Sequence, residues 1–214
     1  MDNQFFRSMS YGVYITTSYE GGRAAGCITN SNTQITASPA TVCVSVNHDN
    51  FTNQCIARSG KFAFTVLSEQ SDPSLIGRFG FSSSRDVNKF EDLQEGLVKW
   101  VDGVPVVAAG CGYAVCRVIG TMETSTHTVF LGEVVAAEAL SEEVPMTYRY
   151  YHEVIRGKSP RNAPTYIAEE PKEPASGGRY VCQVCGYVYE GEELPADFVC
   201  PICKHGAADF KRVE

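Results

Sequence analysis

The chain has 214 residues, more than one average domain needs, and 43% hydrophobic with 20% charged residues is typical of a globular protein. Its formal net charge of −7 argues against a nucleic-acid partner, because sequence-independent affinity for phosphate backbones comes from clustered Lys and Arg. No apolar run approaches the roughly 20 residues of a membrane-spanning helix, so we expect no membrane partner. A small molecule or another protein is the favoured partner.

Six segments rich in β-branched and aromatic residues, bounded by Gly, Pro, Asn or Ser, predict strands. These segments are 11–18, 24–30, 41–47, 61–67, 113–123 and 128–138. Two short helices are expected between them, one over about 50–59 and one over about 73–79, where Asp72 can cap the helix before Pro73. The pattern predicts a mainly β fold with short helices, arranged as a barrel or a sandwich.

The chain divides by composition into two parts. Residues 163–178 are rich in Pro, Gly and acidic side chains and have no apolar periodicity, so we expect a linker there. This prediction gives a large domain over 1–162 and a small domain over 179–214. The small domain is too short to bury a core unaided, so we expect a metal to stabilise it.

Nine cysteines are present, and an odd number cannot all pair within one chain. The N-terminal segment MDNQFFRSMSYG has no apolar core of a signal peptide, so we expect a reducing, cytoplasmic location. Five cysteines fall inside or close to predicted strands or helices, where we expect small buried apolar side chains. They are Cys27, Cys43, Cys55, Cys111 and Cys116.

The other four cysteines form two CxxC pairs in the small domain, Cys182 with Cys185 and Cys200 with Cys203. Four thiolates carried by two tight turns can surround an ion tetrahedrally, and tetrahedral sulfur sites hold zinc or iron. The spacing therefore predicts a metal centre, with iron and a structural zinc both open.

The residues around these pairs resemble rubredoxin. Tyr-Val-Cys-x-x-Cys-Gly-Tyr-x-Tyr begins at Tyr180, and Cys-Pro-x-Cys and a closing Asp-Phe follow. The resemblance implies one iron that carries one electron and is held by all four cysteines, inside a shell of aromatic rings. The rings are those of Tyr180, Tyr187, Phe198 and Phe210. Lys204 stands where the family usually has Gly at a turn that favours positive φ, so we expect strain there.

Two predicted strands of the large domain end in polar side chains. One end is Thr29-Asn30-Ser31, and the other runs from Ser45 through Asn47 into the predicted helix at Asn50. The free N–H groups and the dipole of a helix N-terminus suit a phosphate, although an ordinary capped helix would give the same pattern. Neither GxGxxG nor GxxxxGK occurs, so the usual nucleotide-binding glycine turns are missing.

The order of motifs over about 8–160 resembles the flavin reductase family, whose members fold as an FMN-binding split β-barrel. The segments that carry the resemblance are 12–17, 26–31, 50–52, 59–67, 77–81 and 127–134. The resemblance implies a homodimer that binds FMN and takes electrons from NADH or NADPH. It also implies that Phe81, Ser84, Arg85 and Lys89 form a lid over the site.

The same resemblance assigns candidate site residues. Thr29, Asn30 and Ser31 would meet the flavin ring. The remaining contacts, chiefly to the ribityl chain and the phosphate, would come from Ser45, Asn47, Asn50, Thr52 and Asn53. His127 would lie beside the ring and the nicotinamide as the catalytic residue, and a strand-end histidine bonded to backbone is its structural alternative.

The whole chain then resembles the high-molecular-weight rubredoxins, which are flavin reductase–rubredoxin fusions that donate electrons to flavodiiron proteins reducing oxygen or nitric oxide. The resemblance implies transfer from NAD(P)H through FMN to the rubredoxin iron and on to an acceptor protein. Acidic residues near the metal could steer a basic acceptor. They are Glu190, Glu192, Glu193 and Asp197.

Two alternatives stay open at this point. One is a flavin and iron electron carrier without its own nicotinamide site, which fits the missing dinucleotide motif. The other is a free-flavin or ferric reductase whose tail is a zinc ribbon.

Overall fold

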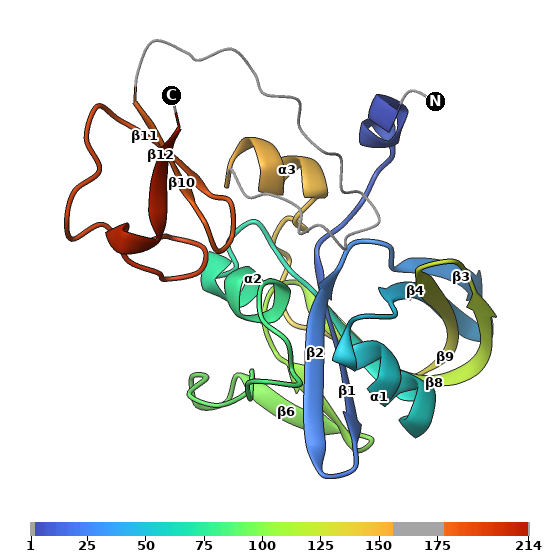
Figure 1. Ribbon diagram of the computed structural model, residues 1–214. Helices are drawn as coiled ribbons and strands as arrows, with labels where there is room; N and C mark the ends of the chain where they lie inside the picture. The colour runs from blue at the N-terminus through green and yellow to red at the C-terminus, as the bar shows by residue number, and fades with distance from the viewer. Residues whose placement is uncertain (1–2, 156–177, 214) are drawn as a thin grey trace.

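The computed structural model describes residues 3–155 and 178–213, and the linker predicted at 163–178 lies outside them except for its last residue. Seven antiparallel strands form one curved sheet in the order β2-β1-β5-β8-β9-β4-β3 (Figure 1). The strands are β1 (Tyr14–Glu20), β2 (Arg23–Thr29), β3 (Thr33–Ala37), β4 (Ala40–Asn47), β5 (Lys61–Val66), β8 (Gly112–Glu123) and β9 (His127–Ala139). The sheet curls until β2 approaches β4, which confirms the predicted barrel-like, mainly β fold.

Two helices of the large domain match the prediction. Helix α1 (Phe51–Ser59) covers β1 and β2, and it ends at Gly60, whose φ of 69° is the left-handed conformation that Gly favours. Helix α2 (Pro73–Gly80) begins where the Asp72 side chain accepts a hydrogen bond of 2.8 Å from the backbone N–H of Ser74.

The sequence prediction missed four elements of the large domain besides a 3-10 turn at Asn3–Ser8. They are β3, the hairpin strands β6 (Val98–Val101) and β7 (Val104–Val107), and the short helix α3 (Tyr148–Glu153). Strand β3 is exposed along its whole length and so has no apolar alternation. The hairpin turns at Asp102–Gly103, where both residues have positive φ. Helix α3 is too short to show a helical apolar period.

The barrel interior is packed around Phe62, Phe130, Ile56 and alternate residues of β4. Cys27, Cys55 and Cys116 are buried, as predicted. The prediction is wrong for the other two large-domain cysteines, which are only partly buried. Cys43 lies on the face of β4 opposite the buried Val42 and Val44, and Cys111 lies in the turn before β8. All nine cysteines lie within the described residues and are free thiols.

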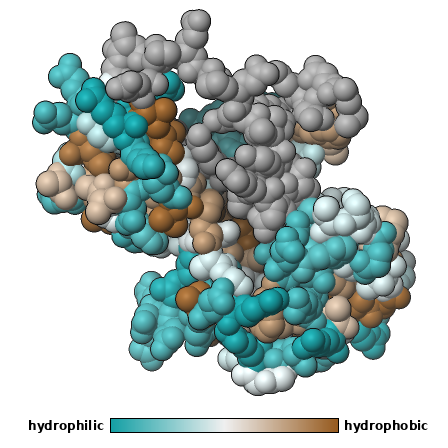
Figure 2. Space-filling view, viewed as in Figure 1, coloured by the Kyte–Doolittle hydropathy of each residue, from teal (hydrophilic) through white to brown (hydrophobic). Residues whose placement is uncertain are grey.

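The small domain is built on a three-stranded sheet in the order β11-β10-β12. Its elements are β10 (Arg179–Cys182), β11 (Val188–Glu190), a 3-10 turn (Ala207–Asp209) and β12 (Phe210–Val213). Apolar residues lie along the side of this domain that is turned toward the barrel (Figure 2). Buried residues of both domains belong to one hydrophobic cluster, so the two domains share a packed interface.

Within residues 3–155 and 178–213, no helix has the length and apolar character that crossing a membrane requires.

Candidate active site and metal centre

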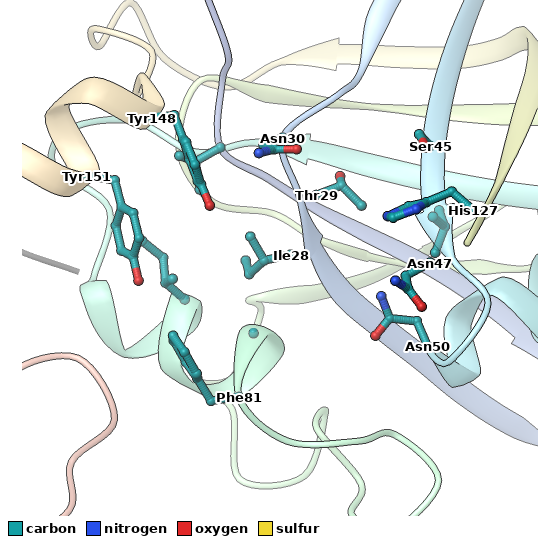
Figure 3. Close-up of a pocket in the computed structure, with 14 residues that line it drawn as sticks. Ile28, Thr29, Asn30, Ser45, Asn47, Asn50, Phe81, His127, Tyr148 and Tyr151 are labelled. Atoms are coloured by element: carbon teal, nitrogen blue, oxygen red, sulfur yellow. The ribbon is translucent and has the colours of Figure 1, made fainter. Parts of the chain in front are cut away.

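An open pocket lies at the ends of β2, β4 and β9, against α2 and α3 (Figure 3). A concave site of apolar and aromatic side chains with a few polar groups suits a small molecule or a cofactor. One wall is polar and carries Thr29, Asn30, Ser45, Asn47, Asn50 and His127. The facing wall is apolar and aromatic and carries Val13, Ile28, Ile76, Phe81, Tyr148 and Tyr151.

Six of the nine predicted flavin-site residues, those of the polar wall, thus line one pocket. The sheet register explains how distant positions meet. Asn47 and His127 are directly paired across β4 and β9, and Ser45 lies two residues before Asn47 on the same face. Helix α1 begins beside them, and the Asn50 side chain makes no capping hydrogen bond.

The other three predicted residues do not line the pocket. The Ser31 Oγ donates to the backbone oxygen of Ser45 at 3.4 Å. Asn53 is buried and its Nδ2 donates to the backbone oxygen of Val46 at 2.9 Å. Thr52 is also buried, beside the Cys27 thiol. In this structure these side chains support the pocket walls, and their contact with a cofactor stays a prediction.

The predicted lid is wrong for Ser84 and Lys89, which are buried away from the pocket. The Lys89 ammonium donates at 2.8 Å to the backbone oxygens of both Gly26 and Phe79, and Ser84 hydrogen-bonds the backbone of Gly26. Burial lowers the pKa of Lys89 to about 8. These two residues fix their loop onto β2. Among the predicted lid residues, only Phe81 lines the pocket.

His127 presents a nitrogen that the protein leaves unused. Its Nδ1 lies 2.8 Å from Thr126 Oγ1, whereas its Nε2 is buried and has no hydrogen-bond partner among the described residues. Burial, with the neighbouring His48, lowers the pKa of His127 below its ordinary value of 6.5, so the ring is neutral at pH 7. A buried polar atom usually has a partner, so Nε2 fits a pocket whose occupant supplies one.

Tyr148 and Tyr151 were missed by the sequence analysis. They lie on α3 with their rings stacked at a centroid distance of 5.9 Å, and they complete the aromatic wall. Their spacing of three residues in the segment YRYYHE is the only sequence signal for them. A pocket with one aromatic wall and one amide- and hydroxyl-rich wall fits a tricyclic flavin ring, which has an apolar edge and a polar edge.

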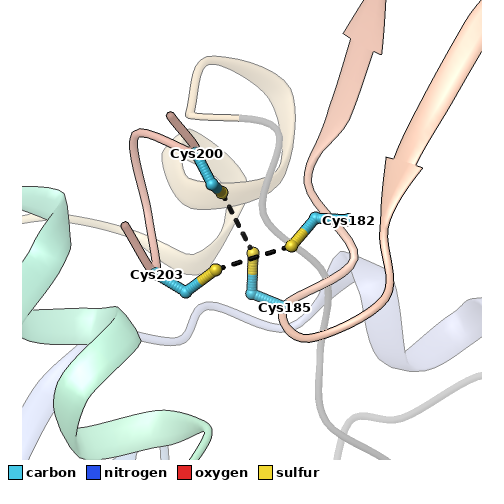
Figure 4. A group of neighbouring side chains, drawn as sticks. All are labelled: Cys182, Cys185, Cys200 and Cys203. Atoms are coloured by element: carbon cyan, nitrogen blue, oxygen red, sulfur yellow. Dashed lines mark hydrogen bonds between the residues drawn. The ribbon is translucent and has the colours of Figure 1, made fainter. Parts of the chain in front are cut away.

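The four predicted metal ligands meet at one point (Figure 4). All four Sγ atoms lie within 4.8 Å of one another, and the pairs Cys182–Cys203 and Cys185–Cys200 are 3.5 Å apart. Metal–sulfur bonds of about 2.3 Å in a tetrahedron require sulfur–sulfur edges of about 3.8 Å. The donor set and its spacing therefore fit one tetrahedral ion of iron or zinc.

The two metal-binding turns have the same local geometry. The backbone N–H of Cys182 donates to Tyr187, and that of Cys200 donates to His205, at 2.9 and 2.8 Å. The residue after each pair has positive φ, 74° at Gly186 and 60° at Lys204. The strain expected at Lys204 is therefore present, since a side chain in this region is disfavoured.

Hydrogen bonds to sulfur favour a thiolate at Cys200, whereas the hydrogen bond with Cys200 and burial raise the pKa of Cys185. The bond from Cys185 and the backbone N–H groups of Cys203 and Ile202 lower the pKa of Cys200 well below its usual range. Two of the four predicted rings, Tyr187 and Phe210, pack against the buried cluster that contains the cysteines. Phe198 lies next to these two rings at centroid distances of 6.4 and 5.3 Å, whereas Tyr180 packs against Tyr189. Such a shell of sulfur hydrogen bonds and apolar groups tunes the reduction potential of a bound iron.

The pocket and the metal centre share one packed interior. Ile76 and Tyr151 line the pocket, and both belong to the buried cluster that contains Cys182, Cys185 and Cys200. Together these features define a flavin-binding oxidoreductase barrel joined to a four-cysteine metal domain.

Comparison with known proteins agrees with this class. Residues 6–158 match the model of the flavin reductase like domain, and residues 180–211 match that of the rubrerythrin, rubredoxin-like domain. The chain belongs to the flavin reductase family and carries a C-terminal rubredoxin-like domain. It is therefore an oxidoreductase-type flavoprotein with a metal-binding electron-transfer domain.

Two curated proteins and one solved structure are similar to the chain. A high molecular weight rubredoxin from Moorella thermoacetica is 35% identical over the full length of both chains. A ferric-chelate reductase (NAD(P)H) from Archaeoglobus fulgidus is 37% identical and covers 78% of this chain and 98% of its own. The structure of an NADH:FAD oxidoreductase from Streptomyces globisporus has a TM-score of 0.59 and 26% identity, covering 67% of this chain and 84% of its own.

Proposed function

We propose that this protein transfers electrons from NADH or NADPH through FMN to a single iron held by its four cysteines, and from there to an acceptor protein. The observation that carries the proposal is the packing of a flavin-type pocket and a four-thiolate site against one buried cluster within one chain. Full-length similarity to a high molecular weight rubredoxin supports the same combination.

Different residues of the pocket would hold different parts of FMN. Thr29 and Asn30 would meet the polar edge of the ring, and the aromatic wall of Phe81, Tyr148 and Tyr151 its apolar edge. Asn47 and the start of α1 at Asn50 would hold the ribityl chain and the phosphate, since the first N–H groups of a helix favour an anion. His127 Nε2 would hydrogen-bond the ring or the nicotinamide. A bound flavin accepts two electrons as a hydride and releases them singly, and one iron takes one electron at a time.

The rubredoxin-like spacing and its aromatic shell favour iron over zinc in the four-cysteine site. Exposed acidic residues lie in the segment that joins the two metal-binding turns, at Glu190, Glu192, Glu193 and Asp197. They suit a basic docking patch, and we propose a flavodiiron protein as the acceptor.

A homodimer is proposed as the assembly. Exposed apolar side chains on β3, β8 and β9, including Ile35, Ile119 and Met122, support a covered face there.

Anaerobic mixing of the FMN-loaded full chain with NADH, and separately with NADPH, tests the proposal. We expect the yellow flavin band to bleach first and the red ferric–thiolate band to follow. Absence of bleaching with either nucleotide would leave only a carrier that is reduced by another enzyme. A colourless metal-loaded tail that contains zinc would remove the iron step.

Ferric-chelate reduction is a second candidate, because the similar Archaeoglobus fulgidus protein covers the barrel and is named for that activity. Addition of a ferric chelate to the NADH-reduced protein distinguishes the two. A Cys200→Ser variant that reduces the chelate as fast as the wild type would assign this activity to the barrel alone.

A further inference from the structure

Helix α2 and the second metal-binding turn touch through a glycine. A Cβ atom added to Gly77 would lie 2.2 Å from the backbone oxygen of Ile202 and 2.9 Å from the Cα of Cys203. Both neighbours are backbone atoms beside a metal ligand, so they cannot turn away as a flexible side chain could. Gly is also a poor residue inside a helix, so helix stability gives no reason for it here. The close contact with the metal-binding turn explains why glycine stands at this position.

The metal ligand at this contact is the least buried of the four. Cys182, Cys185 and Cys200 are at most 2% exposed, whereas Cys203 is only partly buried. The groove between the domains is lined by Cys203 together with Gly77 and Arg78 of α2 and by Phe81. The accessible edge of the metal centre is therefore turned toward the flavin domain.

Phe81 continues the contact to the other site, because it lines both this groove and the cofactor pocket. Tyr151 makes a parallel connection, since it lines the pocket and packs in the cluster with Cys185 and Cys200. Two aromatic side chains thus span the space between the candidate flavin and the metal ligands.

We propose that the metal domain receives electrons and delivers them through the same edge, at Cys203, and that α2 covers this edge while the domain is docked. Gly77 is the positioning residue that permits docking. The domain must then leave α2 before a protein acceptor reaches the metal. The electron-transfer part of this inference rests on the proposed function, whereas the docking part does not.

The test compares a Gly77→Ala variant with a Gly206→Ala control in the FMN- and iron-loaded full chain. Gly206 belongs to the same metal-binding loop, but an added Cβ would meet nothing within 4 Å there. For Gly77→Ala we expect faster hydrogen exchange in α2 and reduction of the metal by the flavin slowed by about tenfold or more, because transfer scales with the docked population. Oxidation of the pre-reduced metal by cytochrome c, a basic one-electron acceptor, should become faster. The Gly206→Ala control should match the wild type in α2 hydrogen exchange, in the rate of metal reduction by the flavin and in the rate of metal oxidation by cytochrome c.

Each contrary outcome overturns a defined part. Unchanged α2 exchange and unchanged rates in Gly77→Ala would refute docking through this residue. If the flavin reduces the metal more slowly in Gly77→Ala but oxidation by cytochrome c is unchanged, then electrons do not enter and leave through the same edge at Cys203. If NADH does not reduce the wild type, the proposed function fails, yet dithionite-reduced protein still tests exchange and oxidation. Should Gly77→Ala fold poorly, Val184→Lys places a further cation in the groove that Arg78 and Lys204 already line, and this variant must give the same changes.

Discussion

Asn47 and His127 lie directly opposite each other in the antiparallel pairing of β4 with β9, and both side chains line the cofactor pocket. Residues opposite each other in a ladder project from the same face, so Asn47 and His127 are neighbours in space although 79 residues lie between them in the chain. One register therefore sets both the amide and the imidazole against the same ligand.

Replacement of His127 tests its role in the pocket. His127→Ala removes the buried Nε2, and we expect flavin reduction by NADH to slow about 10- to 100-fold, the value of one hydrogen bond of about 1.5–3 kcal/mol. His127→Gln should recover part of the rate. Stopped-flow absorbance measures both. His48→Gln, outside the pocket, should keep the wild-type rate at pH 8, and an equal loss in that variant would contradict the assignment.

The pH dependence of the same step follows from the lowered pKa of His127. The folded state binds fewer protons than the unfolded state just below pH 6.5, so the stability that this group contributes is complete above that pH and declines as the pH falls. The reduction rate should accordingly be flat at pH 7–8 and change only in more acidic solution. The inflection should disappear in His127→Gln, and a wild-type inflection above pH 7 would be inconsistent with a buried neutral ring.

Because of Lys89, the stability of the flavin domain should change with pH in alkaline solution. Its folded pKa of about 8 lies below its ordinary 10.5, so the folded state becomes more stable as the pH rises from 8 toward 10.5. Lys89→Met should abolish this rise. It should also destabilise the domain by about 1–3 kcal/mol at pH 8, since Phe79 loses a buried hydrogen-bond donor. Denaturant midpoints measure both, with the exposed Lys99→Met as control.

Lys204→Gly should stabilise the metal domain. Relief of the left-handed strain at φ 60° is expected to contribute about 1 kcal/mol. The same substitution at Lys211, an exposed position in β12, should destabilise by about 0.5–1 kcal/mol because Gly weakens a strand. Thermal loss of the thiolate–metal absorption reports both changes, and a Lys204→Gly variant that is less stable than the wild type would show that the turn is unstrained.

Removal of the metal should unfold residues 179–214 while the barrel stays folded, because so short a domain depends on its metal. Cys200→Ser or a strong chelator should abolish the thiolate–metal absorption and the hydrogen-exchange protection of β10 and β12. Cys43→Ser, which alters a partly buried cysteine far along the chain, should change neither. A folded, protected small domain after chelation would refute the dependence.

Local patterns in the sequence predicted much of this molecule for physical reasons. Asp72 before Pro73 marks the start of α2, and alternating apolar residues mark β4, because each signal acts within a few residues. The four cysteines are predictable since tetrahedral coordination constrains their spacing. Strand β3 and the Tyr148–Tyr151 pair were not predicted, because an exposed edge strand and a two-turn helix are defined by neighbours distant in sequence. The buried roles of Ser84 and Lys89 likewise depend on Gly26, far away in the chain.

The central claim is electron transfer within one chain from the pocket to the four-cysteine centre. Stopped-flow mixing of FMN- and iron-loaded protein with excess NADH, at several protein concentrations, tests it most directly. The account predicts that the flavin band bleaches first and that the ferric–thiolate band follows at a rate independent of protein concentration. A metal reduction rate that rises in proportion to protein concentration, or a metal that stays oxidised beside a reduced flavin, would contradict it.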